Sequence, residues 1–250
     1  MDEYLIAHLN DLKESSLKND YFVFSNFLSL QEQAYLKRKE PHLLVDGVLF
    51  PNDEKERKIL CFNSSYASIE ESIDLLKPIA LLKIYPKNQK FAETISHRDV
   101  LGALLSLGIK REMIGDIYVD SKTAYAYVIS SIIEEIKTNL ASIKRNQIKI
   151  EILNSLDCPI KTEYIEKTIS VSSNRIDSII SEVFSMSREV AKKHIEAGDV
   201  YSNEHDSIKN DISLMENEII SVRGYGRFCY IGEIGTSKKG KLRIKIKMPK

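Results

Sequence analysis

The sequence predicts a mixed α+β protein made of three consecutive segments. Apolar residues at helical spacing open the first segment, strands and helices interleave in the second, and two short helices lie among strands in the third. The chain has 250 residues, 43% of them hydrophobic and 29% charged, which is enough for roughly one to three globular domains. We predict domains over residues 1–75, 76–155 and 156–250.

Residues 1–75 are predicted to combine helices with strands. The helical spacing is carried by Leu5, Ile6, Leu9 and Leu12. Ser29 followed by Glu32 has the form of a capping box, which marks the start of another helix. Residues 42–62 read as two strands, with turn signals at 46–47 and 51–53. No motif in this segment indicates a catalytic or binding site.

Residues 76–155 are predicted to form a split βαβ sandwich, because strand-like and helical segments interleave. The predicted strands cover 79–86, 113–120, 123–130 and 146–153, and the predicted helices cover 96–109 and 131–143. Ser96 is the expected N-cap of the first helix, with Asp99 three positions on.

Residues 156–250 are predicted to start with a linker and a strand, followed by two helices and further strands. The first helix places Ile176, Ile179, Ile180 and Val183 on one side. The second helix begins at Ser187 as N-cap and ends at Gly198. Residues 241–248 alternate apolar and basic side chains, as a half-buried strand does.

Composition excludes several classes of protein. The three cysteines form no CxxC pair, so neither a disulfide framework nor a zinc site is indicated, and a reducing cytoplasm fits. The first sixteen residues lack the basic start and apolar core of a signal peptide. No run of about 18 apolar residues exists, so no membrane span is expected. We expect no cofactor and no metal ion.

Positive charge is concentrated near the end of the chain. Lys+Arg and Asp+Glu both number 36, but residues 175–250 contain 14 basic and 11 acidic residues, and residues 238–250 contain seven basic and none acidic. Lys and Arg release counterions from a polyphosphate, and Arg can grip a phosphate through two hydrogen bonds. A solvated basic surface without a partner explains the charge equally well.

The residue pattern from 175 to 203 resembles the S-four RNA-binding domain, which is also found in pseudouridine synthases and tyrosyl-tRNA synthetases. The matching residues are Arg175, Ile176, Asp177, Ser187, Arg188, Ala191, Ile195, Gly198, Val200 and Asn203. The pattern's later glycines are replaced by Glu204 and Asn217, and its Lys-Pro-Ser element is residues 209–211. Asn tolerates the left-handed backbone that a turn glycine adopts.

The resemblance extends to the YlmH family of bacteria, most closely over residues 97–119 and 175–247. It implies a cytoplasmic protein, not an enzyme, with an N-terminal domain, an RRM-like middle domain and an S-four-type C-terminal domain. It also implies binding to ribosomal RNA of the large subunit and rescue of stalled subunits that carry peptidyl-tRNA. There the protein would support C-terminal tailing of the stalled chain by an NEMF-type factor.

The charge pattern and this resemblance together give the candidate RNA-binding residues: Arg175, Ser187, Arg188, Lys192, Lys193, Arg223, Arg227, Lys238, Lys239 and Lys241. Ser187 is favoured as a helix cap, and Asp177 as a partner that orients nearby basic groups. Arg175 and Arg188 are expected to be exposed, so that reversing their charge would change stability little. Reversing the charge of Lys55, in the loop before the second strand of the first segment, is expected to leave RNA binding nearly unchanged.

Other interpretations stay open. Tyr118, Tyr125 and Tyr127 could stack on RNA bases, as sheet aromatics do in RRM domains, although no "GFGFV"-like motif is present and a scaffold role is favoured. Residues 97–99 could suggest catalysis, but a helix start explains them better. An RNA-modifying enzyme of the pseudouridine synthase type and a protein-binding scaffold are the alternatives for the whole chain.

Overall fold

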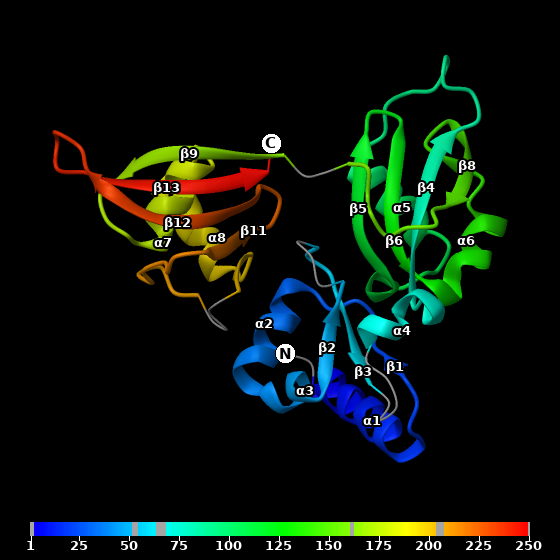
Figure 1. The fold of residues 1–250 in the computed structure, drawn as a ribbon. Coiled ribbons are helices and arrows are strands. Elements are labelled where there is room, and N and C mark those ends of the chain that lie inside the picture. The colour runs from blue at the N-terminus through cyan, green and yellow to red at the C-terminus, as the bar shows by residue number, and fades with distance from the viewer. Residues whose placement is uncertain (1–2, 52–54, 64–68, 161–162, 204–207, 250) are drawn as a thin grey trace. The chain divides into compact units, whose positions relative to one another are not determined.

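The computed structural model describes residues 3–51, 55–63, 69–160, 163–203 and 208–249 (Figure 1). The chain divides into two compact units, Met1–Lys161 and Thr162–Lys250, here called the N-terminal and C-terminal units. Both combine helices with antiparallel strands, which confirms the predicted α+β class. The division into three domains stays a prediction. Asn52, Asp53 and Glu204 lie outside the described residues.

The N-terminal unit begins with helices packed on a three-stranded antiparallel sheet of order β1-β3-β2. Its elements are α1 (Glu3–Asn19), β1 (Val23–Phe24), α2 (Leu30–Lys39), α3 (Pro41–Val45), β2 (Gly47–Phe50), β3 (Ile59–Phe62) and α4 (Ile69–Leu76). The capping box of α2 is confirmed: Glu32 N donates to Ser29 Oγ at 3.3 Å and Ser29 N donates to Glu32 Oε2 at 2.6 Å. Residues 42–45, read as part of the strand region, are instead helical, because Pro41 occupies the first helical turn, where its missing N–H costs nothing.

The same unit continues into a five-stranded antiparallel sheet of order β5-β6-β4-β8-β7, called here the middle sheet. Its elements are β4 (Ile79–Pro86), α5 (His97–Leu105), η1 (Arg111–Met113), β5 (Ile114–Asp120), β6 (Thr123–Ile129), η2 (Ser130–Ile132), α6 (Ile133–Asn139), β7 (Ser142–Ile143) and β8 (Asn146–Ile152). With β4 and β6 in the centre, this is the predicted split βαβ arrangement. The second helix is shorter than predicted, because Ser142 and Ile143 pair with β8 instead of continuing it.

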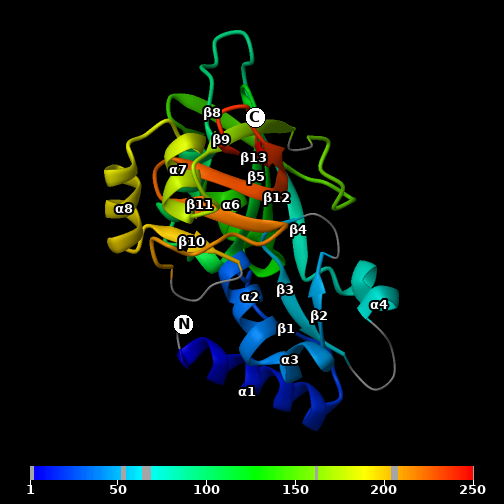
Figure 2. The same ribbon diagram turned by 90° about the vertical axis from the view of Figure 1, so that its left-hand side faces the viewer.

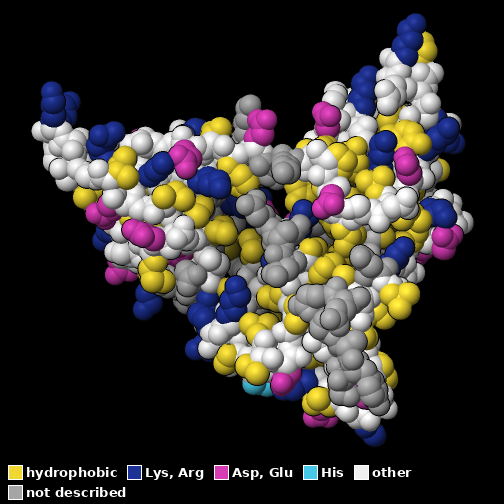
Figure 3. All heavy atoms as spheres, in the orientation of Figure 1, with side chains coloured by type: hydrophobic (Ala, Val, Ile, Leu, Met, Phe, Trp, Pro, Cys, Tyr) yellow, Lys and Arg dark blue, Asp and Glu magenta, His cyan; other side chains and the backbone are white. Residues whose placement is uncertain are grey.

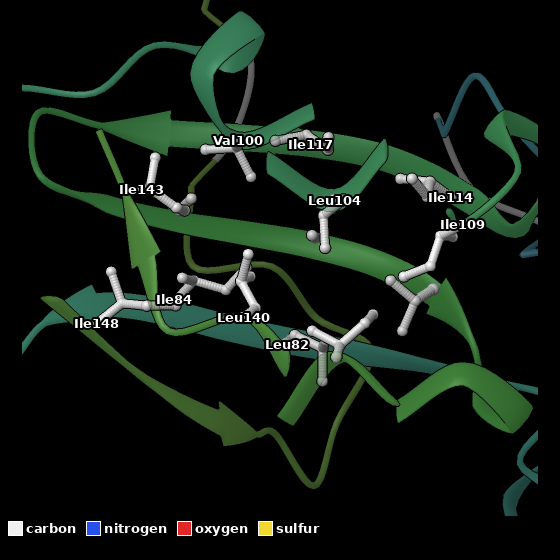
Figure 4. Packing of buried hydrophobic residues seen from close by; sticks show 14 of the residues in the cluster. Leu82, Ile84, Val100, Leu104, Ile109, Ile114, Ile117, Leu140, Ile143 and Ile148 are labelled. Atoms are coloured by element: carbon white, nitrogen blue, oxygen red, sulfur yellow. The ribbon is translucent and has the colours of Figure 1, made fainter. Parts of the chain in front are cut away.

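One face of the middle sheet carries a core with the two helices. Val100 and Leu104 of α5 pack against Ile117 of β5 and Leu82 and Ile84 of β4 (Figure 4). All five side chains are at most 8% exposed. This burial, at about 25 cal/mol per Å² of apolar surface, stabilises the split βαβ fold.

The opposite face of the middle sheet is covered as well. The alternation along β6 sends Tyr125 and Tyr127 to this face, where they join Phe27, Ile59 and Cys61 from the preceding part of the unit. Residues 153–158 also pack there, and the Tyr127 hydroxyl donates to the carbonyl of Leu156. Both faces of the sheet are therefore occupied by the chain itself.

The C-terminal unit is a five-stranded antiparallel sheet of order β10-β11-β12-β13-β9 with two helices packed on it (Figure 2). Its elements are β9 (Tyr164–Val171), α7 (Ile176–Val183), α8 (Arg188–Glu196), β10 (Val200–Ser202), β11 (Glu218–Val222), β12 (Gly226–Thr236) and β13 (Leu242–Pro249). Ile176, Ile179 and Ile180 are buried against Ile244 and Ile246, as the alternation of the tail predicts. Asn217 has φ +65°, so it does adopt the left-handed backbone expected of a glycine substitute.

Within the described part of the chain, every helix is too short or too polar to cross a lipid bilayer.

Candidate nucleic-acid interface

The candidate interface is built around the first turns of α7 and α8. Arg175 is the N-cap of α7 and Asp177 lies in its first turn, while Ser187 is the N-cap of α8 and Arg188 is its first residue. Val190 N donates to Ser187 Oγ at 3.2 Å, so the cap role predicted for Ser187 is confirmed. Asp177 has no exposed side-chain surface, although it is a carboxylate.

Asp177 holds both arginines. Arg188 Nη2 lies 2.8 Å from Asp177 Oδ2, and Arg175 Nε lies 3.2 Å from Asp177 Oδ1. Burial alone would raise the pKa of Asp177, but the hydrogen bonds and positive charges of Arg188 and Arg175 outweigh it and lower that pKa. The orienting role predicted for Asp177 is therefore confirmed.

The two arginines also face solvent. Their side chains are 39% exposed for Arg175 and 46% for Arg188, even though each is paired. A guanidinium has five N–H donors, so one edge can hold the buried carboxylate while another stays available for a phosphate. This pairing argues against the expectation that charge reversal here changes stability little, because a new carboxylate would face the buried one.

Two lysines extend this basic surface along α8. Lys192 and Lys193 are both exposed. Lys192 lies four residues after Arg188, which places the two side chains on the same side of the helix. Glu189 and Glu196 are exposed on α8 too, so the surface carries both signs of charge, and its positive residues are Arg175, Arg188, Lys192 and Lys193.

A second basic group lies at the turn between β11 and β12. Arg223 is 77% exposed and its Nη1 lies 3.8 Å from Asp199 Oδ1. Arg227, also predicted as a contact, is partly buried, and this burial lowers its pKa. Arg223 therefore offers a phosphate contact more readily than Arg227 does.

Tyr225, in the same turn, was not singled out from the sequence. It is 46% exposed and its ring lies 5.2 Å from that of His194 and 5.9 Å from that of Phe184. An aromatic ring held in place between Arg223 and Arg227 could stack on an exposed base. The available sequence signal was the tyrosine between two glycines in "RGYGR".

The remaining predicted contacts form a third group. Lys238, Lys239 and Lys241 are exposed at the turn that joins β12 to β13. Lys241 N donates to Ser237 Oγ at 3.0 Å, which fixes that turn. Figure 1 shows this hairpin protruding, and Figure 3, in the same orientation, shows basic side chains at its tip. The structure thus brings Arg175, Arg188 and Lys192 together but leaves the tail lysines at a separate turn.

The middle sheet does not offer an open stacking surface. Tyr127 is only 1% exposed, and Tyr118 and Tyr125 pack in the same buried cluster. Lys55 Nζ lies 5.3 Å from the centre of the Tyr127 ring and 5.9 Å from that of Tyr118. The structure therefore argues against these tyrosines as base-stacking residues, while the expectation that Lys55→Glu leaves RNA binding nearly unchanged stays a prediction.

Residues 97–99 open a helix, as predicted. Asp99 N donates to the N-cap Ser96 Oγ at 3.3 Å and Ser96 N donates to Asp99 Oδ2 at 2.8 Å. Lys144 Nζ lies 3.1 Å from Asp99 Oδ2. Capping and ion pairing therefore account for Asp99. Among the residues that the structure describes, no three His, Cys, Asp or Glu side chains gather where they could hold a metal ion.

Comparison with known proteins finds a matching family and a relative that spans most of the chain. Residues 78–157 match the family YlmH_RBD, described as "Putative RNA-binding domain in YlmH". Over 228 residues the chain is 28% identical to "Ribosome-associated protein quality control protein P2" of Bacillus subtilis (strain 168). The aligned region covers 88% of this chain and 84% of that protein.

A solved structure, "Cell division protein ylmH from Streptococcus pneumoniae", matches with 16% identity and a TM-score of 0.48, and covers 61% of this chain and 90% of that chain. The family match and the curated relative confirm the resemblance that the sequence motifs indicated. This chain is thus similar to the YlmH proteins, and residues 78–157 match the model of their "Putative RNA-binding domain".

Proposed function

We propose that this protein binds ribosomal RNA of the large subunit through α7 and α8 of its C-terminal unit. The observation that carries the proposal is the buried Asp177 carboxylate with Arg188 and Arg175 paired to it at the surface. Such an arrangement holds two guanidiniums in fixed positions before a phosphate arrives, which reduces the entropy lost on binding. The relative's name supports association with the ribosome, and the family matched by residues 78–157, described as a "Putative RNA-binding domain", supports RNA binding by the chain as a whole.

The more specific role that we propose is rescue of stalled large subunits that still carry peptidyl-tRNA. The name of the Bacillus subtilis relative, a ribosome-associated quality control protein, supports this role. The protein would support C-terminal tailing by an NEMF-type factor, and it would act in the cytoplasm. Neither the family nor the relative is named as an enzyme, and we propose binding without catalysis. Appearance of a modified base after incubation with ribosomal RNA would contradict this.

The test of RNA binding is a double charge reversal on α8, Lys192→Glu with Lys193→Glu. Both lysines are exposed, so stability should stay within about 0.5 kcal/mol per substitution. Affinity for purified large subunits should fall at least tenfold, or about 1.4 kcal/mol. The measurement is co-sedimentation over a series of salt concentrations. The slope of log affinity against log salt should become shallower by about 0.7–0.9 for each lost phosphate contact.

The matched control is Lys37→Glu with Lys39→Glu, another pair of exposed lysines on a short helix, α2. This variant should sediment with subunits as the unaltered protein does. Equal affinity of the α8 variant and its control would show that α8 is not the binding surface. The rescue role needs a second comparison, in which subunits that carry peptidyl-tRNA should bind more tightly than empty ones.

A further inference from the structure

We propose that one end of the middle sheet is a second RNA contact, which takes an unpaired segment and stacks one of its bases on Phe91. This end, called here the loop end, consists of residues 87–95, 120–122 and 143–146. The inference rests on the proposed RNA-binding function but assigns a different surface from α7 and α8. Because the tyrosine face of the sheet is buried, RNA bound by this domain needs another surface.

The three segments of the loop end are fastened together. Lys87 N donates to the carbonyl of Gln147 at 2.8 Å, and Ile95 N donates to the carbonyl of Ser121 at 2.9 Å. Asn146, only 6% exposed, accepts from Glu93 N at 3.0 Å and donates to its carbonyl at 2.8 Å. The loop therefore leaves the sheet and returns to it at fixed points, which orders it before any ligand binds.

Basic side chains gather on this framework. Lys122 Nζ donates to the carbonyl of Gln89 at 2.9 Å, and Lys144 Nζ donates to the carbonyl of Thr94 at 3.1 Å. The basic residues of the loop end are Lys87, Lys90, Lys122, Lys144 and Arg145, and its acidic residues are Glu93 and Asp120. Asp99, at the adjoining helix start, is paired with Lys144. The excess of positive charge favours a polyanion.

Phe91 lies in a turn of the segment 87–95. Its side chain is 80% exposed, and Lys90 Nζ lies 5.7 Å from the centre of its ring. Figure 3 shows basic and hydrophobic side chains together at the tip of this loop. A single exposed ring beside cations fits a base and its phosphates, because the ring stacks while the cations contact the backbone. An apolar peptide or a lipid surface would need a wider apolar patch than one ring among polar residues.

The RNA must be unpaired at this point. In an A-form helix the base faces are stacked on one another, so a protein ring reaches them only where bases are splayed out. The loop end thus complements α7 and α8, whose basic residues suit the phosphates of folded RNA.

The experiment uses the absence of tryptophan from the sequence. Phe91→Trp makes the ring at the tip the only indole in the full-length chain. A uridine oligomer of about ten nucleotides is the probe, since an OB-fold site spans roughly 4–16 nucleotides and uridine stacks weakly on itself. Base stacking should quench the tryptophan fluorescence in a saturable way. Tyr4→Trp is the matched control, because Tyr4 is 77% exposed on α1, and its fluorescence should not change.

Affinity measurements complete the test. Phe91→Ala should weaken binding of a labelled oligomer about tenfold without changing the melting temperature. Lys90→Glu should weaken it and reduce its salt dependence, while Lys18→Glu at the exposed end of α1 should not. Absence of quenching, or equal affinity of Phe91→Ala and the unaltered protein, would overturn the inference. So would a fluorescence change with anionic lipid vesicles but not with RNA.

The two proposals fail separately. In the Phe91→Trp background, Lys192→Glu with Lys193→Glu should leave quenching by the oligomer intact while binding to large subunits falls. Loss of quenching in that variant would assign the oligomer to α8 and overturn the loop-end inference. Retained subunit binding by that variant, together with normal quenching, would overturn the proposed role of α8 and leave the loop end standing.

Discussion

At the scale of single residues, Asp177 determines what Arg175 and Arg188 can do. A buried carboxylate is stable only when it is paired, and here both partners are half-exposed arginines. The motif in the sequence indicated the arginines and suggested that Asp177 orients them. It did not show that the side chain of Asp177 has no exposed surface. The arginines are thus structural residues as well as candidate contacts.

Removal of one arginine should therefore destabilise the C-terminal unit. In Arg188→Ala, Asp177 keeps only Arg175 of its two arginine partners. We therefore expect the free energy of unfolding, measured by chemical denaturation, to fall by about 2 kcal/mol. Arg223→Ala, which removes an exposed arginine 3.8 Å from its partner carboxylate, is the matched control and should cost less than about 1 kcal/mol. Equal stability of the two variants would show that Asp177 does not depend on Arg188.

The same pair predicts a pH dependence. The pKa of Asp177 is lowered in the folded state, so its contribution is present above the unfolded pKa of about 3.9 and is lost as pH falls through the folded pKa. Asp177→Asn should therefore destabilise the protein at pH 7, and the difference from the unaltered protein should shrink below about pH 4. Denaturation curves across this range check the prediction. A difference that is constant with pH would mean that the charge of Asp177 is not what matters.

At the scale of elements, local rules predicted much of the structure. The caps at Ser29, Ser96 and Ser187 and the alternation along β13 depend on neighbouring residues, and all of them are confirmed. Features that depend on distant partners were missed. The covering of the tyrosine face of the middle sheet comes from β1, β3 and residues 153–158, and no short window of sequence contains both sides of that contact.

The N-cap of α8 separates a structural role of Ser187 from a direct RNA contact. Ser187→Ala should destabilise the protein by about 1 kcal/mol, because Val190 N loses its acceptor. Ser187→Asn restores an equally good cap without charge and should keep both the stability and the affinity for large subunits. Thermal melts and co-sedimentation of the two variants make the comparison. A stable Ser187→Asn variant that binds poorly would instead identify the serine hydroxyl as an RNA contact.

At the scale of the whole molecule, each unit has a hydrophobic core of its own. The buried cluster of the C-terminal unit draws all its residues from 169–248, and the other three clusters lie within residues 5–158. Net charge differs slightly between the units as well, since residues 162–250 contain 15 basic and 13 acidic residues in a chain that is neutral overall. Two units with separate cores can bind two parts of one RNA, and linked contacts raise the overall affinity through effective concentration.

Cutting the chain between the units should therefore separate the two proposed activities. Fragments 1–161 and 162–250 should each unfold cooperatively, because each retains its complete core. The C-terminal fragment should keep the salt-sensitive affinity for folded ribosomal RNA, and the N-terminal fragment with Phe91→Trp should keep quenching by the uridine oligomer. Both should bind large subunits more weakly than the intact chain, since each has lost the linked contact.

A folded C-terminal fragment that binds ribosomal RNA no better than the N-terminal one would contradict the assignment of α7 and α8. Full affinity for subunits in that fragment alone would show that the loop end adds nothing to ribosome binding.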